Sequence, residues 1–157
     1  MLVDTKPKTF SELVRISGFS HGTDVWLNNA QDLIRDKVVP LKEAVSTRDD
    51  IMNYLIQHGI KPKTSFKVME NVRKGKGIDK LNKAGQKTTD YEGELKAGNI
   101  PQWFIDSCHK IGYLFPRAHA VAYVMMAFRI AWYKINYPLA YYAAFFTIRA
   151  KPLNYRP

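Results

Sequence analysis

The residues best suited to chemistry are cations that stand next to glycine. The stretch "RKGKG" at 73–77 places Arg73, Lys74 and Lys76 beside two glycines. Glycine amides can approach phosphate oxygens closely, and the three cations carry the opposite charge. Lysines at the end of a helix also complement its dipole without binding any ligand. The stretch therefore indicates either a phosphate contact or an ordinary helix end.

A second group of candidate side chains lies in "FPRAHAVAYVMMAFRIAWYKINYP", residues 115–138. At about 100° per residue, His119, Tyr123, Met126 and Ile130 share one face of a helix. His119 and Tyr123 are one turn apart, so an imidazole and a phenol could face the same ligand. A histidine satisfied in the protein interior explains the same spacing, and the residues alone do not decide between the two.

A third candidate is the stretch "SHGTD" at 20–24. Ser20, His21 and Thr23 supply two hydroxyls and an imidazole ahead of a helix that we expect to begin at Thr23 or Asp24. A turn of this kind at a helix N-terminus can bind an anion, or it can simply cap the helix.

The usual sequence patterns for metal and nucleotide-binding loops are missing. The chain contains no GxxxxGK[ST], GxGxxG or HExxH pattern, no Asp-x-Asp and no pair of cysteines. Asp49 and Asp50 are adjacent, so on a helix they diverge by roughly 100° and suit a helix start better than a shared metal. We therefore expect no metal ligands and no two-metal phosphoryl-transfer centre in this chain.

The net charge of +10 is concentrated in two blocks. Residues 61–87 carry +7 and residues 117–157 carry +6, whereas residues 1–60 and 88–116 are slightly acidic, at −1 and −2. Two separate basic blocks favour a polyanion such as nucleic acid or nucleotide phosphates as the ligand. A solvated lysine-rich surface is the alternative for either block.

Length and cysteine content place the chain in a broad class. With 157 residues and 46% hydrophobic content, it can form one domain with a real core, or a large part of something bigger. Its single cysteine, Cys108, fits a reducing compartment, and we expect a cytoplasmic location. The longest wholly apolar run, residues 120–128, is far shorter than the ~20 residues of a spanning helix, so we expect no membrane partner.

The periodicity of apolar residues predicts an all-α, multi-helix domain. Residues 78–98 show weak periodicity and many turn formers, so we expect an exposed hairpin or flexible basic loop there, and an insertion. Capping-box spacings stand at Thr9 and Thr47. Tyr141–Tyr142 and Phe145–Phe146 are expected to pack in the core, although they could instead form a docking surface for a partner. Helices are expected over 10–17, from 23 or 24, over 47–58, from 64 to 72, from about 101 to 111, over 116–137 and after Pro138.

Four stretches resemble, in this order, the fingers region of the PolC-type DNA polymerase III alpha subunit, a replicative polymerase of the C family. They are "TFSELVRISGFSHGTDVWLNNAQDLI", "RDDIMNYLI", "VMENVRKGKG" and "IPQWFIDSCHKIGYLFPRAHAVAYVMMAFRIAWYKINYPLAYYAAFFTIRA". The resemblance implies a fingers domain over residues 1–150, followed by a divergent tail at 151–157. It also implies a part in DNA-directed DNA synthesis by a nucleotidyltransferase. This chain by itself is expected to be inactive, because the palm carboxylates are not in it.

The resemblance also implies roles for individual residues. The expected partners are a deoxynucleoside triphosphate (dNTP), primer-template DNA and the remainder of the alpha subunit, and Mg2+ would come with the nucleotide and the palm. Tyr123 is expected on the base or sugar side, and Arg129 and Lys134 are expected to contact DNA. The expected phosphate contacts are Arg48, Arg73, Lys74, Lys76, Arg117 and His119. The opposite wall of the pocket is expected to be Ser20, His21 and Thr23.

An alternative function comes from the charge pattern alone. The chain could be a small helical module that grips a nucleic-acid backbone through its two basic blocks and has no nucleotide pocket. That function predicts polynucleotide binding that weakens steeply with salt, with no preference for free triphosphates.

Overall fold

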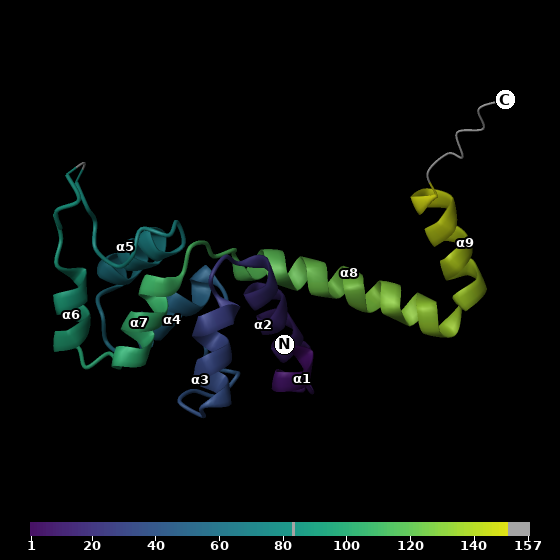
Figure 1. Ribbon diagram of the computed structural model, residues 1–157, viewed down its shortest axis with the longest axis horizontal. Coiled ribbons are helices and arrows are strands. Elements are labelled where there is room, and N and C mark those ends of the chain that lie inside the picture. The colour runs from purple at the N-terminus through teal and green to yellow at the C-terminus, as the bar shows by residue number, and fades with distance from the viewer. Residues whose placement is uncertain (83, 151–157) are drawn as a thin grey trace. The chain divides into compact units, whose positions relative to one another are not determined.

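The computed structural model describes residues 1–82 and 84–150, which belong to two units (Figure 1). The first unit is Met1–Val121, and the second begins at Ala122. Within the described residues every regular element is a helix, which confirms the all-α class. The α-helices are α1 (Leu2–Thr5), α2 (Phe10–His21), α3 (Gln31–Arg35), α4 (Arg48–Gln57), α5 (Pro62–Val72), α6 (Tyr91–Ala97), α7 (Gln102–Lys110), α8 (Arg117–Asn136) and α9 (Pro138–Arg149).

The core of the first unit is built from apolar faces of its helices. Leu55 of α4, Val68 of α5 and Phe104 of α7 are completely buried. Tyr54 stacks on Phe104 with ring centroids 4.4 Å apart, and Figure 1 shows α4, α5, α6 and α7 gathered at one end of this unit. Burying each large apolar side chain contributes about 1.5–3 kcal/mol. This packing gives the segments between the helices a firm base.

Side-chain caps define the starts of two helices. At α2, the Glu12 amide donates to Thr9 Oγ1 (3.2 Å) and the Thr9 amide donates to Glu12 Oε2 (3.0 Å), so this capping box is confirmed. At α4, one carboxylate oxygen of Asp50 accepts from the amides of Ser46 (3.0 Å) and Thr47 (2.9 Å). Arg15 lies 3.3 Å from the same oxygen and balances its charge.

Helix α2 is longer than predicted. We expected it to end at residue 17, but it continues through Gly18 and ends at His21. Gly18 lies inside the helix because α2 touches the backbone of Ser46 there, and a Cβ at position 18 would lie 2.6 Å from the Ser46 carbonyl oxygen. Phe19, only 2% exposed, holds the last turn in the core. Gly18, which predicted a helix end, is therefore a site where two backbones pack closely.

The prediction that a helix begins at Thr23 or Asp24 was wrong. Residues 26–30 contain non-helical backbone angles, and α3 begins at Gln31. The cause is Asn29, a buried side chain whose amide donates to the carbonyl oxygens of Asp24 (3.0 Å) and Ser107 (3.3 Å). Its Oδ1 accepts from the Ser107 hydroxyl (2.7 Å). The two bonds to Ser107 join residues 78 positions apart, and they hold Asn29 in a non-helical conformation.

The expected loop over residues 78–98 is present only in its first half. Leu81 and Lys87 form an isolated antiparallel bridge, but Tyr91–Ala97 form helix α6. Leu95 of α6 is completely buried, which the weak periodicity did not reveal. That this stretch is an insertion relative to the family stays a prediction.

The second unit is far more exposed than predicted. Ala120 is the only residue of α8 that is buried, and none of α9 is, among the residues described. The aromatic pairs at 141–142 and 145–146 were expected in the core, yet Phe146 is 62% exposed. The prediction was wrong because an apolar helix face indicates that the face is covered, but it does not show whether this chain or another surface covers it. No described helix has the length and hydropathy needed to cross a membrane.

Candidate functional site

The segment between α7 and α8, residues 111–116, is the centre of the candidate site and is called the connecting segment below. Tyr113 pairs with Thr23 as an isolated antiparallel bridge, in which the Thr23 amide donates to the Tyr113 carbonyl (3.0 Å) and the Tyr113 amide to the Thr23 carbonyl (3.2 Å). The Leu114 amide donates to the carbonyl oxygen of Arg73 (3.2 Å). The stretches "SHGTD" and "RKGKG" are therefore both bonded to this segment.

The other end of the connecting segment is tied to the start of α4. The Arg48 amide donates to the carbonyl oxygen of Phe115 (3.1 Å). The Arg117 amide donates to the carboxylate of Asp49 (2.6 Å), which thereby caps α8. Four stretches that are widely separated in the sequence thus meet along a few residues of backbone.

Glycine at position 75 allows this meeting. Gly75 has φ +68°, and a Cβ there would lie 2.3 Å from the carbonyl oxygen of Gly112. The first glycine of "RKGKG" is thus required for packing of the protein backbone against itself. Its contact with Gly112 brings the end of α5 to the connecting segment.

Aromatic rings form a cluster at this junction. Phe115 stacks on His119 with centroids 4.7 Å apart and planes at 20°. His21 meets the His119 ring edge-on at 5.7 Å, and Tyr113 meets Phe115 edge-on at 4.9 Å. The half-buried His119 is therefore held by rings on two sides, and its imidazole is already oriented.

His21 stands at the end of α2, so the expectation that "SHGTD" precedes a helix N-terminus was wrong. Its Nδ1 lies 2.8 Å from the Ser17 carbonyl oxygen, which can only accept. Nδ1 therefore carries the proton in the neutral ring, and Nε2 is the acceptor. The Ser20 hydroxyl also donates to Ser17 (3.0 Å), so it completes the helix end.

Arg73 and Lys74, two of the expected phosphate contacts, are both paired with Glu70, a carboxylate of α5. Arg73 Nη2 donates to Glu70 Oε2 (2.9 Å), Arg73 Nε donates to Glu70 Oε1, and Lys74 Nζ lies 3.1 Å from Glu70. The hydrogen bonds from Arg73, helped by Lys74, lower the pKa of Glu70 to about 2. Glu70 holds both cations in place, and a phosphate that binds them must compete with it.

We expect Glu70→Gln to change how stability depends on acid. The pKa of Glu70 is lowered from 4.5 to about 2 in the folded chain, so its stabilisation is present above pH 4.5 and is lost as pH falls toward 2. The variant lacks this contribution, which is at most about 1 kcal/mol for a pair near the surface. Urea unfolding at pH 6, 4 and 3 should therefore show the gap between wild type and variant closing.

Glu43→Gln controls for the loss of one negative charge, because Glu43 lies 3.9 Å from Lys42 in an exposed pair. A gap between wild type and Glu70→Gln that stays constant from pH 6 to 3 would contradict the role assigned to Glu70.

The structure divides the expected site residues into three sets. Backbone bonds bring Thr23, Arg48 and Arg73 to the connecting segment. Arg117 stands at its end, where the Asp49 carboxylate accepts from its amide, and His21 and His119 lie together there. Lys74 and Lys76 line a separate cleft with residues of α5 and α6. Tyr123, Arg129 and Lys134 belong to the second unit.

Sequence reasoning missed three contributors to this site. Tyr113 and Phe115 supply ring contacts and were not candidates. Asp49 was expected at a helix start but not as the cap of α8. The aromatic residues of "GYLF" at 112–115, between two strong helix signals, were the available clue.

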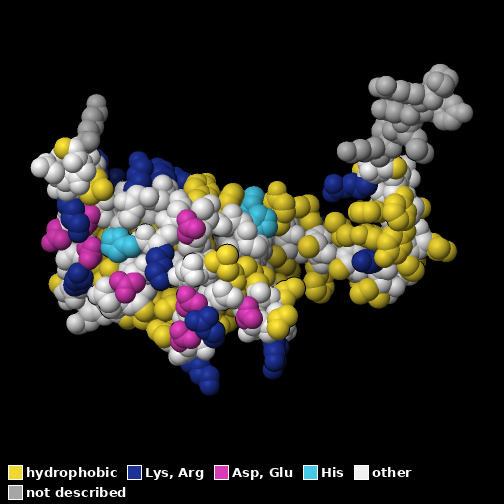
Figure 2. Space-filling model, in the orientation of Figure 1, with side chains coloured by type: hydrophobic (Ala, Val, Ile, Leu, Met, Phe, Trp, Pro, Cys, Tyr) yellow, Lys and Arg dark blue, Asp and Glu magenta, His cyan; other side chains and the backbone are white. Residues whose placement is uncertain are grey.

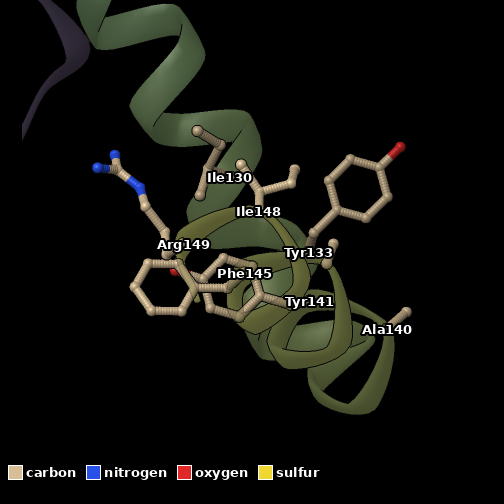
Figure 3. A pocket seen from close by; sticks show the side chains of 8 residues that line it. Ile130, Tyr133, Ala140, Tyr141, Phe145, Ile148 and Arg149 are labelled. Carbon is tan, nitrogen blue, oxygen red and sulfur yellow. The ribbon is translucent and has the colours of Figure 1, made fainter. Parts of the chain in front are cut away.

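The second unit contains an apolar pocket of about 510 Å³ between the end of α8 and α9 (Figure 3). Its lining includes Ile130 and Tyr133 of α8 and Tyr141, Phe145 and Ile148 of α9. Its lining is almost entirely apolar, so it offers van der Waals contact and no set of groups for chemistry. Among the described residues, no three histidine, cysteine, aspartate or glutamate side chains are grouped so that they could hold a metal ion.

Comparison with known proteins identifies the family. Residues 1–94, more than half of the chain, match the model of the bacterial DNA polymerase III alpha subunit finger domain. The chain belongs to this family, and the resemblance seen in its motifs is confirmed.

The curated relatives are named DNA polymerase III PolC-type. The chain is 59% identical over 154 residues to the protein of Caldanaerobacter subterraneus subsp. tengcongensis. It is 60% identical over 149 residues to that of Thermotoga maritima and 58% identical over 150 residues to that of Bacillus subtilis. These matches cover 98%, 95% and 96% of the chain but only 10% of each relative.

Proposed function

We propose that this fingers domain binds the incoming dNTP and the nascent base pair within a PolC-type replicative DNA polymerase. The observation that carries the proposal is the connecting segment, which draws together the cation-bearing starts of α4 and α8, the end of α5 and the turn after α2. Cations gathered from several elements suit a triphosphate, which carries several negative charges.

Each group has a role that follows from its chemistry. Arg48, Arg73 and Arg117 neutralise phosphate charge, with Lys74 and Lys76 adding positive potential from the adjoining face. His119 donates to a phosphate oxygen from an orientation fixed by Phe115, and His21, with Ser20 and Thr23, borders the other side. Tyr123 is the proposed contact to the base or sugar, and Arg129 and Lys134 are the proposed contacts to primer-template DNA.

Catalysis by such a polymerase requires groups that this chain does not supply. Positioning the triphosphate and neutralising its charge contribute to the rate. The described carboxylates form no ligand group for an ion, so the proposal assigns Mg2+ to the bound nucleotide and to the palm. This chain alone is expected to bind nucleotide without extending a primer.

Calorimetric titration of the 157-residue chain with a dNTP and Mg2+ tests the proposal. We expect saturable binding that weakens about five- to tenfold in His119→Ala and more in Arg73→Ala/Lys74→Ala, because charge-assisted hydrogen bonds are lost. His58→Ala is the matched control for the histidine, since His58 stacks on Tyr54 at the far end of α4. Arg35→Ala/Lys37→Ala, at exposed positions near α3, controls for the loss of two charges.

The alternative function gives a different outcome. If the folded chain ignores triphosphates but binds primer-template DNA in a salt-sensitive way, the nucleotide site is wrong and the backbone-binding module is favoured. Equal losses in His58→Ala and His119→Ala would also reject the site at His119.

We further propose that the remainder of the alpha subunit covers the apolar surface of the second unit. Figure 2 shows hydrophobic side chains over most of the visible face of this unit. Leu139 is 88% exposed and Ile148 is 80% exposed, which is unusual for a surface that meets only water. The chain spans only 10% of the length of its relatives, so about nine times as many residues are present in them to cover this surface.

A further inference from the structure

Lysine side chains surround a cleft of about 260 Å³ between α5, the residues that follow it and α6. This basic cleft is lined by Lys67, Lys74, Lys76 and Lys80, together with Phe66 and Tyr91. Figure 2 shows lysine and arginine side chains gathered at the edge of the molecule above α5. The cleft is separate from the ring cluster of His21, Phe115 and His119, none of which lines it.

The charge of the basic cleft is poorly balanced. Glu70 is the one carboxylate among its described lining residues, and it is already bonded to Arg73 and Lys74. A neighbouring cleft of about 400 Å³ shares Lys76 and Lys80 with the first and is also lined by Gly75 and Leu81. The two form a continuous positive path that fits a chain of phosphates better than a single anion.

The backbone that carries these lysines is held firmly. The Asn71 side chain donates to the Ile78 carbonyl (3.0 Å), and the Lys76 amide donates to the Asn71 carbonyl (3.1 Å). Asp79, only 4% exposed, accepts from the Tyr91 amide (2.6 Å) and so fixes α6 to the end of this loop. The lysines therefore project from a defined surface.

An aromatic ring lies open among these charges. Phe66 is 45% exposed, although it stands in a helix whose other face is buried. An exposed ring beside lysines is the arrangement by which proteins bind single-stranded nucleic acid, because an unpaired base stacks on the ring while the cations hold the backbone. Paired bases in a duplex are already stacked on their neighbours and leave no face for Phe66.

We propose that the basic cleft binds single-stranded DNA, with phosphates along Lys67, Lys76 and Lys80 and one base stacked on Phe66. The identity of the strand, the unpaired template, rests on the proposed function in a polymerase. The binding itself does not depend on the nucleotide site at the connecting segment.

Fluorescence anisotropy of a labelled twelve-residue thymidine oligonucleotide tests the proposal at several salt concentrations. In Lys67→Gln/Lys80→Gln we expect about a tenfold weaker Kd at low salt and a salt slope smaller by about 1.4, since each phosphate contact on a single strand contributes about 0.7. Phe66→Leu should weaken binding about five- to tenfold with the slope unchanged. Lys8→Gln/Lys37→Gln removes the same charge from exposed positions outside the cleft, and its Kd should change less than threefold.

Three results would overturn the proposal. Equal losses in the two lysine variants would show that only net charge matters, and a Phe66→Leu variant that binds as wild type would remove the stacked base. If Lys67→Gln/Lys80→Gln lost dNTP binding in parallel, and free dNTP displaced the oligonucleotide, the cleft would be a triphosphate site. We expect His119→Ala to lose dNTP binding and to keep oligonucleotide binding. If dNTP did not bind the wild-type chain but the oligonucleotide did, the proposed function would be rejected and the proposal for the basic cleft would be supported.

Discussion

Replacing Gly75 by alanine should lower the free energy of unfolding by about 3 kcal/mol. Gly75 has φ +68°, a conformation that costs an alanine about 1 kcal/mol or more. The added Cβ would also lie 2.3 Å from the carbonyl oxygen of Gly112, so the backbone itself must move. Urea unfolding followed by circular dichroism measures the loss.

The same substitution should weaken dNTP binding even under conditions where the variant remains folded. Moving Gly112 disturbs the bond from Leu114 to Arg73 and the bridge between Thr23 and Tyr113. Those contacts hold two of the stretches that form the proposed site. The expected loss of affinity is therefore larger than for His119→Ala alone.

Gly59→Ala is the matched control for Gly75→Ala. Gly59 has φ +83°, but nothing lies within 4 Å of a Cβ built there. It should lose only the cost of the left-handed conformation, about 1 kcal/mol. If the two variants were equally stable, the close approach of residue 75 to residue 112 would have no energetic weight.

The chain by itself should associate through its second unit, and Leu139→Glu/Ile148→Glu should weaken that association about a hundredfold or more. Both side chains are at least 80% exposed on an apolar surface, so removing them from water favours self-contact by about 25 cal/mol per Å². A charge at each position must be desolvated on contact. Sedimentation velocity over a concentration series gives the association constant.

The substitutions should leave folding intact, because the two residues make little contact within the chain. Val3→Glu/Leu27→Glu introduces the same charges at residues 81% and 68% exposed in the first unit and should associate as wild type does. A wild-type chain that stays monomeric at all concentrations would contradict the proposal that the remainder of the alpha subunit covers this surface.

The helical class, several helix starts and the family could all be predicted from the order of the amino acids. Periodic apolar positions such as Leu55, Val72 and Phe104 depend on local geometry, and so does the capping box at Thr9. The family motifs are long and ordered, so they could be read without a structure. The cations of the proposed site were also found this way, because their residue types stand out.

Two features could be seen only in the folded chain. They are the places where long-range contacts extend or interrupt a helix, and the place where the candidate residues meet. Gly18 continues α2 because Ser46 lies against it, and Asn29 interrupts a helix because Ser107 bonds to it. The connecting segment gathers its partners through backbone bonds, which have no side-chain signature in the sequence. The exposure of α8 and α9 could not be predicted from the sequence either. Periodicity shows that a helix face is apolar, but it does not show which surface covers that face.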